Sequence, residues 1–343
     1  MKILLIQLRQ LGDILLTTPV IRALHEYDTN VVVDVLTYPM GKLIIPGNPL
    51  IHRHIVAPQK GVLESLRFVR ELQKYRYDAV IDFMSTPRSA VMARLVKAKT
   101  RISFATGRRA FFTHVVPRDG HNEYIVREKF KLLKPLGVEA NDVRLMLPWG
   151  DGDAGAPKLF YADHPHLAAS KRRVLLSPTH RRSERKWPAQ SWATLARWLE
   201  KKQDAAVIWA WGPGEDGEVA AIQSLAQGAG IMAPRLSFRE LAALTASCDL
   251  FVGNSNGPSH VAVAVNTPSI QLHGPTKAQS WCPQTERHRA IQDVSMASIS
   301  PDSVQAMIES MWSLIDRGSA DLRTFGSICC SDDVWRVRPS LTK

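Results

Sequence analysis

Long apolar runs are missing from this sequence of 343 residues, although 45% of its residues are hydrophobic. No stretch approaches the roughly 20 consecutive apolar residues that cross a bilayer as a helix. The opening MKILLIQLRQ is interrupted at Arg9, too early for the apolar core of a signal peptide. We therefore expect a globular protein that stays in the cytoplasm and has no membrane span.

Cysteine is scarce and is not spaced for metal or disulfide chemistry. The four cysteines are Cys248, Cys282, Cys329 and Cys330, with no CxxC pair and no histidines at zinc-finger distances. This spacing argues against a zinc site, and a chain of this length does not need a disulfide framework. We expect reduced thiols without a role in function, and no bound metal.

The two common glycine-rich nucleotide signatures are missing as well. No Walker A sequence is present, and no GxGxxG follows the first apolar strand. These absences argue against a P-loop nucleotide hydrolase and against an ordinary dinucleotide-dependent dehydrogenase.

Acidic residues are too few to balance the basic ones, so the net charge is +12. Between Arg88 and Lys134, 12 basic and three acidic residues leave a charge of +9. A solvated face explains scattered lysines, but this density favours an anionic partner: nucleic acid, a membrane surface or a phosphorylated substrate. Because the run lacks interleaved aromatic residues and the chain lacks nucleic-acid-binding signatures, we expect no nucleic acid partner.

Short apolar, β-branched runs alternate with amphipathic segments along most of the chain. In the first half the expected strands are 2–8, 30–37, 54–58 and 77–83, and the expected helices are 18–27 and 62–75. After residue 170 the expected strands are 172–178, 204–212, 230–234, 248–254 and 268–274, with helices at 188–202, 217–228, 237–247, 258–266 and 302–316. This alternation predicts two α/β domains, each with a parallel sheet covered on both faces.

A polar, aperiodic stretch from 149 to 166 interrupts the alternation and predicts the linker between the domains. We expect a first domain over 1–160, a second over 168–316 and a loosely packed tail over 317–343. Ligands of such folds bind beside the carboxyl ends of the strands. The site is therefore expected in a cleft lined by strand-to-helix loops of both domains.

The loops after two late strands are the best candidates for binding an anion. In DLFVGNSNGPSH (249–260), Gly257 allows close approach of the backbone, and the amides at the following helix start suit a phosphate. His260 lies in the first turn of that helix, and Thr276 ends the next loop, Gly274-Pro275-Thr276. Such loops also use glycine and asparagine for geometry alone, but two of them with a histidine between favour an anion site.

The loop in SPTHRRSERKWP (177–188) is basic and follows another expected strand. Arg185 or Lys186 is placed to neutralise a diphosphate, whereas Arg181 and Arg182 fit a solvated basic loop equally well.

The loop in WAWGPGEDGE (209–218) is acidic and begins a helix. Glu215 or Asp216 at this strand end could accept hydrogen bonds from ribose hydroxyls. The helix dipole also favours an acid in the first turn, so a purely structural role is the alternative.

Three motifs together resemble the lipopolysaccharide heptosyltransferases of glycosyltransferase family 9. They are LRQLGDILLTTPVIRAL (8–24), KWPAQSWATLA (186–196) and GPSHVAVAVNTPSIQLHGPT (257–276), and the resemblance extends over about 1–316. It implies a GT-B fold, in which two Rossmann-like domains face an interdomain cleft and the second binds the donor. It also implies inverting, metal-independent transfer of heptose from ADP-L-glycero-D-manno-heptose, without a cofactor. The implied acceptor is the anionic, lipid-linked inner core of lipopolysaccharide, at the cytoplasmic face of the inner membrane.

Asp13 lies where the first strand passes into the first helix, and the resemblance implies that it is the general base. An aspartate at such a junction is commonly a helix cap, but Thr18-Pro19 offers a competing cap for the helix that follows. We therefore expect Asp13 to take the proton of the acceptor hydroxyl as that oxygen attacks the anomeric carbon.

The resemblance also assigns residues to the donor and to the acceptor. The expected donor-binding residues are Thr179, Arg185, Lys186, Glu215, Ser255, Asn256, Gly257, His260 and Thr276. The expected acceptor-binding residues, from the basic run, are Arg88, Arg101, Arg108 and Arg109. Many family members have an aspartate where this chain has Ser255. The alternatives are therefore a GT-B transferase that uses another nucleotide sugar, or a nucleotide-sugar epimerase or hydrolase.

A concentrated basic segment predicts different salt sensitivities for the two substrates. Acceptor binding should weaken steeply as ionic strength rises from about 0.05 to 0.5 M, whereas ADP-sugar binding should change much less, because screening acts most strongly on exposed charges. Binding measured over a salt series checks this. Equal salt sensitivity of the two ligands would contradict it.

Overall fold

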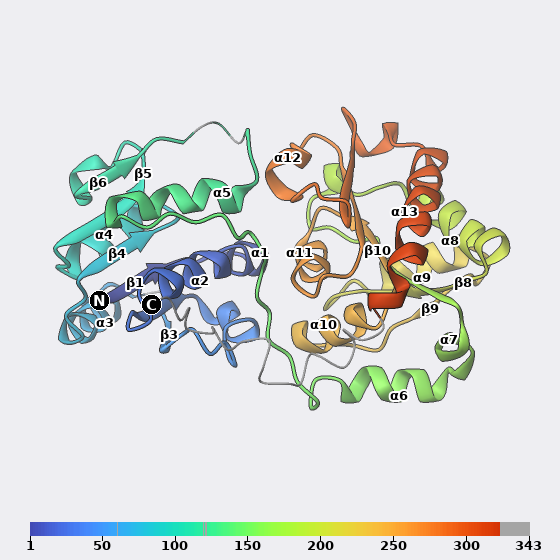
Figure 1. The fold of residues 1–343 in the computed structure, drawn as a ribbon, viewed down its shortest axis with the longest axis horizontal. Helices are drawn as coiled ribbons and strands as arrows, with labels where there is room; N and C mark the ends of the chain where they lie inside the picture. The colour runs from blue at the N-terminus through green and yellow to red at the C-terminus, as the bar shows by residue number, and fades with distance from the viewer. Residues whose placement is uncertain (60, 119, 121, 323–343) are drawn as a thin grey trace, which may run out of the picture. The chain divides into compact units, whose positions relative to one another are not determined.

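The computed structural model describes residues 1–322 apart from 60, 119 and 121, and the chain divides into two units (Figure 1). The first unit is 1–148 and the second begins at residue 149. Each is built on a six-stranded sheet whose neighbouring strands are parallel. Within the described residues, no helix is long and apolar enough to cross a membrane.

In the first unit the strand order is β3-β2-β1-β4-β5-β6. The strands are β1 (Lys2–Ile6), β2 (Val32–Thr37), β3 (Arg53–Val56), β4 (Ala79–Asp82), β5 (Thr100–Phe104) and β6 (His114–Val116). The α-helices are α1 (Leu11–Leu15), α2 (Thr18–Tyr27), α3 (Val62–Lys74), α4 (Pro87–Leu95) and α5 (Ile125–Phe130). Three 3₁₀ helices complete the unit: η1 (Pro39–Leu43), η2 (Arg109–Phe111) and η3 (Lys131–Leu136).

In the second unit the strand order is β12-β11-β10-β7-β8-β9. The strands are β7 (Arg172–Ser177), β8 (Ala205–Trp209), β9 (Ile231–Met232), β10 (Leu250–Asn254), β11 (Ser269–His273) and β12 (His288–Gln292). The α-helices are α6 (Gly155–Asp163), α7 (Pro165–Ala169), α8 (Ala189–Gln203), α9 (Asp216–Leu225), α10 (Phe238–Ala246), α11 (Gly257–Ala264), α12 (Ala278–Trp281) and α13 (Pro301–Leu322). The 3₁₀ helices are η4 (Ser183–Arg185) and η5 (Met296–Ser298).

Both sheets have the same order when their strands are counted along the chain: third, second, first, fourth, fifth, sixth. This is the order of the Rossmann fold, which confirms the predicted pair of Rossmann-like α/β units. The winding direction reverses between β1 and β4 in the first sheet and between β7 and β10 in the second. Ligands of such sheets bind beside the carboxyl ends of the strands at this reversal.

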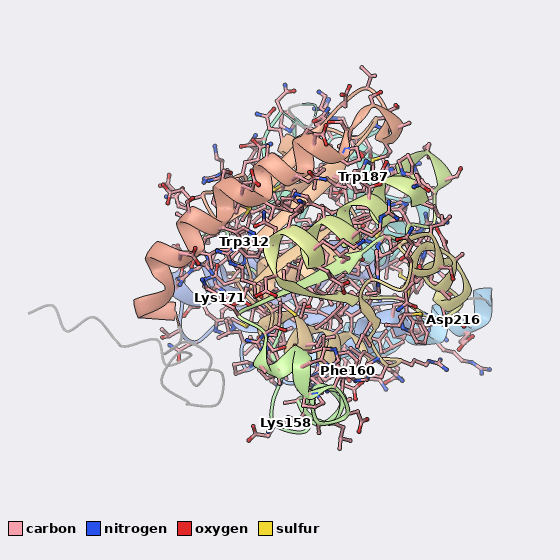
Figure 2. The ribbon with its side chains drawn as sticks, turned by 90° about the vertical axis from the view of Figure 1, so that its right-hand side faces the viewer. Lys158, Phe160, Lys171, Trp187, Asp216 and Trp312 are labelled. Atoms are coloured by element: carbon pink, nitrogen blue, oxygen red, sulfur yellow. The ribbon has the colours of Figure 1, made fainter. Side chains whose placement is uncertain are left out.

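Strand β1, next to the first reversal, has an apolar and fully buried centre, as expected of a strand in the middle of a parallel sheet. Ile3, Leu4, Leu5 and Ile6 of β1 are all completely buried. In the second unit, one core contains Trp187, whose ring meets that of Trp192 edge to face at 4.9 Å. Figure 2 shows Trp187 at the start of α8 and Trp312 on α13, and these two helices pack against each other.

Three strands were not predicted from the sequence: β5, β6 and β12. β6 is only three residues long and β12 reads HRAIQ, so neither gives a continuous apolar run. Both are edge strands with half-exposed or exposed residues. Strands of this kind are recognisable only once the neighbouring strand is known.

The expected aperiodic linker over 149–166 contains helical structure instead. Helices α6 and α7 lie within or across this stretch, and Phe160 and Leu167 are buried in a core of the second unit. Figure 2 shows Phe160 on this element. The glycines and acidic residues near 150–155 made this stretch look aperiodic in the sequence, so the short amphipathic helix after them was not predicted. At the other end, helix α13 continues past the expected end at 316 to Leu322, and 323–343 of the expected tail lie outside the described residues.

All nine tryptophans lie at or beyond Trp149, so intrinsic fluorescence reports on the second unit alone. Trp192→Ala should destabilise that unit by about 3–5 kcal/mol, because it removes a completely buried ring and leaves a cavity. Urea unfolding followed by fluorescence measures this. Val294→Ala is the control: Val294 is 84% exposed, and its truncation should change the free energy of unfolding by less than about 0.5 kcal/mol.

Candidate functional site

The backbone is strained at both strand ends that flank the reversal in the first sheet. Gln10, after β1, has a φ of 55°, and Ser85, after β4, has a φ of 50°. Residues other than glycine adopt such angles at a cost, and they cluster where a loop must present a particular side chain. The strain marks these two loops as the candidate site of the first unit.

Asp13 lies in one of these loops, in the short helix α1. The N-cap residue of α1 is Gln10 and that of α2 is Thr17, so Asp13 is not a helix cap. Its carboxyl group is only partly exposed. Burial raises the pKa of this carboxyl above its ordinary value, while the charges of Lys129 and Arg118 act to lower it.

Lys129 brings a buried positive charge to Asp13 from helix α5. Its ammonium donates to the main-chain carbonyl of Asp13 and to the hydroxyl of Thr17, both at 2.8 Å. Burial lowers the pKa of this ammonium to about 8. In the sequence, Lys129 stands out only as one charge of the basic run. Its spacing from Ile125 and Val126, which are also buried, was the available signal that it faces the interior.

Asp82 is a second carboxylate at this edge, at the end of β4, and it was also missed. It is completely buried, and one carboxylate oxygen accepts hydrogen bonds from the amides of Met84 and Ser85 at 2.9 and 3.2 Å. Burial raises the pKa of Asp82 to about 6. Its bonds hold the strained loop after β4 in place.

Two of the four predicted acceptor arginines are anchored at the same edge of the sheet as Asp13. Arg88 donates to the carbonyls of Pro58 and Gln59, which follow β3, with Gln59 at 2.5 Å. Arg108 donates to the carbonyl of Ser85 at 3.0 Å.

The other two predicted arginines differ from each other. Arg109 is exposed at the start of η2. Arg101 lies near the amino end of β5 and donates to the carbonyls of Ala98 and Phe111 at 2.7 and 3.0 Å. Arg101 therefore lies at the opposite end of its strand from the edge where ligands of parallel sheets bind.

In the second unit, Asn256 organises the loop that precedes helix α11. Its side-chain oxygen accepts from the amide of Ser259 at 3.2 Å, and its side-chain nitrogen donates to the carbonyl of Thr179 at 2.9 Å. Gly257 follows, and a Cβ there would lie 3.2 Å from the ring of Phe238. Asn256 therefore caps α11 and joins its loop to Thr179, and the lack of a side chain at Gly257 allows close packing against Phe238.

The predicted anion-binding residues lie in α11 and in the loop after β11. His260 is 5% exposed, and Thr276 is partly exposed in the loop after β11. His273 is completely buried at the end of β11, and it was not predicted. Burial, together with the charges of His260 and Arg185, lowers the pKa of His273 to about 3. Arg185, His260 and His273 therefore share one electrostatic environment, in which His273 is neutral near pH 7.

The structure distinguishes the two predicted cations of the loop after β7. The ammonium of Lys186 contacts both carboxylate oxygens of Glu218, at 2.8 and 2.7 Å. This ion pair satisfies Lys186 within the protein. Arg185, in contrast, is close enough to the histidines for its charge to lower the pKa of His273.

Glu215 is folded back onto its own loop. One carboxylate oxygen accepts from the hydroxyl of Thr179 at 2.6 Å and from the amide of Gly212 at 2.8 Å. Asp216 is exposed at the start of α9, where Figure 2 labels it. Ser255 is partly exposed, and its amide donates to the carbonyl of Leu272.

The family model of glycosyltransferase family 9 (heptosyltransferase) matches residues 65–307. The chain belongs to glycosyltransferase family 9. Lipopolysaccharide heptosyltransferase 3 of Escherichia coli is 29% identical over 289 residues, which are 79% of this chain and 83% of that relative.

Solved family 9 structures have the same fold. A family 9 glycosyl transferase from Veillonella parvula superposes with a TM-score of 0.80 at 20% identity, covering 90% of this chain and 96% of that one. The E. coli heptosyltransferase WaaC with ADP-2-deoxy-2-fluoro heptose superposes with a TM-score of 0.69 at 19% identity, covering 90% and 99%. The fold is therefore GT-B, as the sequence predicted, and this family 9 protein is a glycosyltransferase.

Metal-ligating side chains of this family 9 member are dispersed. Over residues 1–322, leaving aside 60, 119 and 121, no group of three or more His, Cys, Asp or Glu side chains could hold a metal ion.

His273 should make the stability of the second unit depend on pH. Its pKa is about 3 in the folded state and near 6.5 when unfolded, so the unfolded chain binds the extra proton between these values. Stability contributed by the neutral ring is complete above about pH 6.5 and is lost as pH falls, by about 2 kcal/mol at pH 5. Urea unfolding of the wild type and of His273→Leu, at about pH 7 and 5, measures this difference. The prediction fails if both proteins lose the same free energy.

Proposed function

We propose that this enzyme transfers heptose from ADP-L-glycero-D-manno-heptose to the inner core of lipopolysaccharide, with inversion and without a metal. Membership of a heptosyltransferase family and similarity to a lipopolysaccharide heptosyltransferase support the substrates. The observation that carries the mechanism is Asp13, whose partly exposed carboxylate lies in α1, after β1, and whose main-chain carbonyl accepts from the buried ammonium of Lys129.

The second unit binds the donor diphosphate in this proposal. The amide of Gly257 at the start of α11 and the side chains of Arg185, His260 and Thr276 offer hydrogen bonds and positive charge to the phosphates. Glu215 lies beside Thr179 and the amide of Gly212, and its carboxylate accepts from the ribose of the adenosine if it exchanges the bond to Thr179. WaaC was solved with an ADP-heptose analogue, which supports ADP as the leaving group.

Asp13 acts as general base in the transfer. The acceptor hydroxyl attacks the anomeric carbon, its proton passes to the carboxylate of Asp13, and the bond from the anomeric carbon to the phosphate oxygen breaks. ADP leaves with the electron pair of that bond, stabilised by Arg185 and by the amide of Gly257. A single displacement with one base inverts the anomeric centre, as in inverting glycoside hydrolases.

The first unit attracts the acceptor in this proposal. Arg88 and Arg108 are anchored at the carboxyl edge of the sheet, and Arg109 is exposed nearby in sequence. Lipopolysaccharide precursors carry phosphates and acidic sugars, so a basic surface is the complementary one. Peripheral contact with the anionic inner membrane, at its cytoplasmic face, follows from the same charge.

Asp13→Asn tests both the activity and the base. The wild type, incubated with ADP-heptose and a panel of truncated core acceptors, should release ADP only with an acceptor and at an unchanged rate in EDTA. Asp13→Asn should lower kcat by about 10²–10⁴, the usual contribution of a general base. Tryptophan fluorescence should show that ADP still binds to the variant.

Other outcomes separate the alternatives. Release of free sugar without any acceptor indicates a hydrolase. Turnover with other ADP-sugars but not with ADP-heptose indicates a transferase that uses a different donor, the alternative that Ser255 raised. Near-normal turnover of Asp13→Asn removes Asp13 from the mechanism.

A further inference from the structure

Lys129 is an ammonium group in the interior of the first unit. The residue is 4% exposed, and it occupies the buried face of α5 with Ile125, Val126 and Phe130. Removing an ammonium from water costs several kcal/mol unless hydrogen bonds and opposite charge compensate. A buried lysine therefore needs partners that compensate the cost of burying its charge.

The partners of Lys129 belong to the candidate catalytic loop. Its ammonium donates to the carbonyl of Asp13 and to the hydroxyl of Thr17, which itself donates to the same carbonyl at 2.8 Å. The ammonium also lies 5.3 Å from the centre of the Phe83 ring, in the loop after β4. Lys129 thus joins the two strand-end loops next to the reversal.

These contacts fix helix α1 from one side. A helix of five residues has too few internal hydrogen bonds to be stable alone. The Asp13 carbonyl is the common acceptor for Thr17 and Lys129, so the backbone of Asp13 is held by two donors. The direction in which the Asp13 side chain leaves the backbone is then fixed as well.

We propose that Lys129 is a positioning residue for Asp13: it anchors the Asp13 backbone, and its charge stabilises the Asp13 carboxylate. This inference rests on the proposed role of Asp13 as general base. A neutral residue of the same length could fill the space, but it could not supply the positive charge.

Other charged groups face the same pair, and they set the size of the effect. Arg118 acts on both Asp13 and Lys129, and it is 39% exposed. Glu128, 2% exposed, lies 3.8 Å from Arg118 and partly offsets its charge. Burial alone raises the pKa of Asp13, so loss of either cation should raise it further. Lys129 is closer to complete burial, and its charge is the less screened of the two.

The test is the pH dependence of kcat/KM for Lys129→Met in the full-length enzyme, with ADP-heptose and a truncated core acceptor. Its acid limb, which reports ionisation of the free enzyme's base, should move up by about one pH unit relative to the wild type. The kcat should fall about tenfold, and the affinity for ADP, followed by tryptophan fluorescence, should stay unchanged. Lys74→Met is the matched control, because Lys74 is an exposed lysine paired with Glu71 on α3.

Arg118→Met provides the second measurement. It removes an exposed charge without emptying the core, so it should fold normally, and its acid limb should move in the same direction by a smaller amount. Recovery of the wild-type limb in Lys129→Arg would further support the requirement for charge.

Three results would overturn the proposal. The first is a loss of activity in Lys129→Met with an unshifted acid limb, since that is a packing effect alone. The second is an ADP affinity that falls in parallel with kcat. If Lys129→Met does not fold, an unshifted limb in Arg118→Met is the third. The proposed function fails separately, when the wild type shows no transfer or Asp13→Asn keeps its turnover.

Discussion

The reversal of winding beside the first strand of each sheet is the constraint on which the rest of the structure depends. At β1 and β4, and again at β7 and β10, helices leave to opposite faces, so the strand ends stay uncovered by crossover connections. Asp13 and Asp82 lie at the first of these edges. Asn256 and His260 lie at the second. The order of the strands therefore determines where the candidate site residues lie.

The two edges handle charge in opposite ways. In the first unit, burial of Lys129 is offset by a carbonyl, a hydroxyl and the nearby carboxylate of Asp13, so its ammonium keeps a pKa of about 8 in the interior. In the second, burial leaves His273 neutral beside His260 and Arg185. A cation near Asp13 favours the ionised form of its carboxyl group. A neutral ring adds no repulsion to the positive charge of Arg185.

Sequence alone predicted the fold and the position of Asp13, but not the contacts that define its environment. Helix α2 was predicted with its observed bounds, because Thr18-Pro19 begins a clear apolar period. Asp13 was found because the motif around it is specific. Lys129 was hidden within a basic run, since its partners are 116 and 112 residues away in the chain. The ion pair of Lys186 with Glu218 and the bond from Thr179 to Glu215 are equally non-local, so spacing along the sequence could not reveal which cation or carboxylate is already occupied.

The bond between Thr179 and Glu215 joins the loop after β7 to the loop after β8, and Asn256 joins the loop before α11 to the carbonyl of the same threonine. Three chain segments that come from distant parts of the sequence are thus connected through hydrogen bonds of Thr179. A change in the shape of this surface would have to involve these segments together, because the hydrogen bonds of Thr179 connect them. Diversification of this surface is therefore expected to proceed by correlated replacements instead of independent ones.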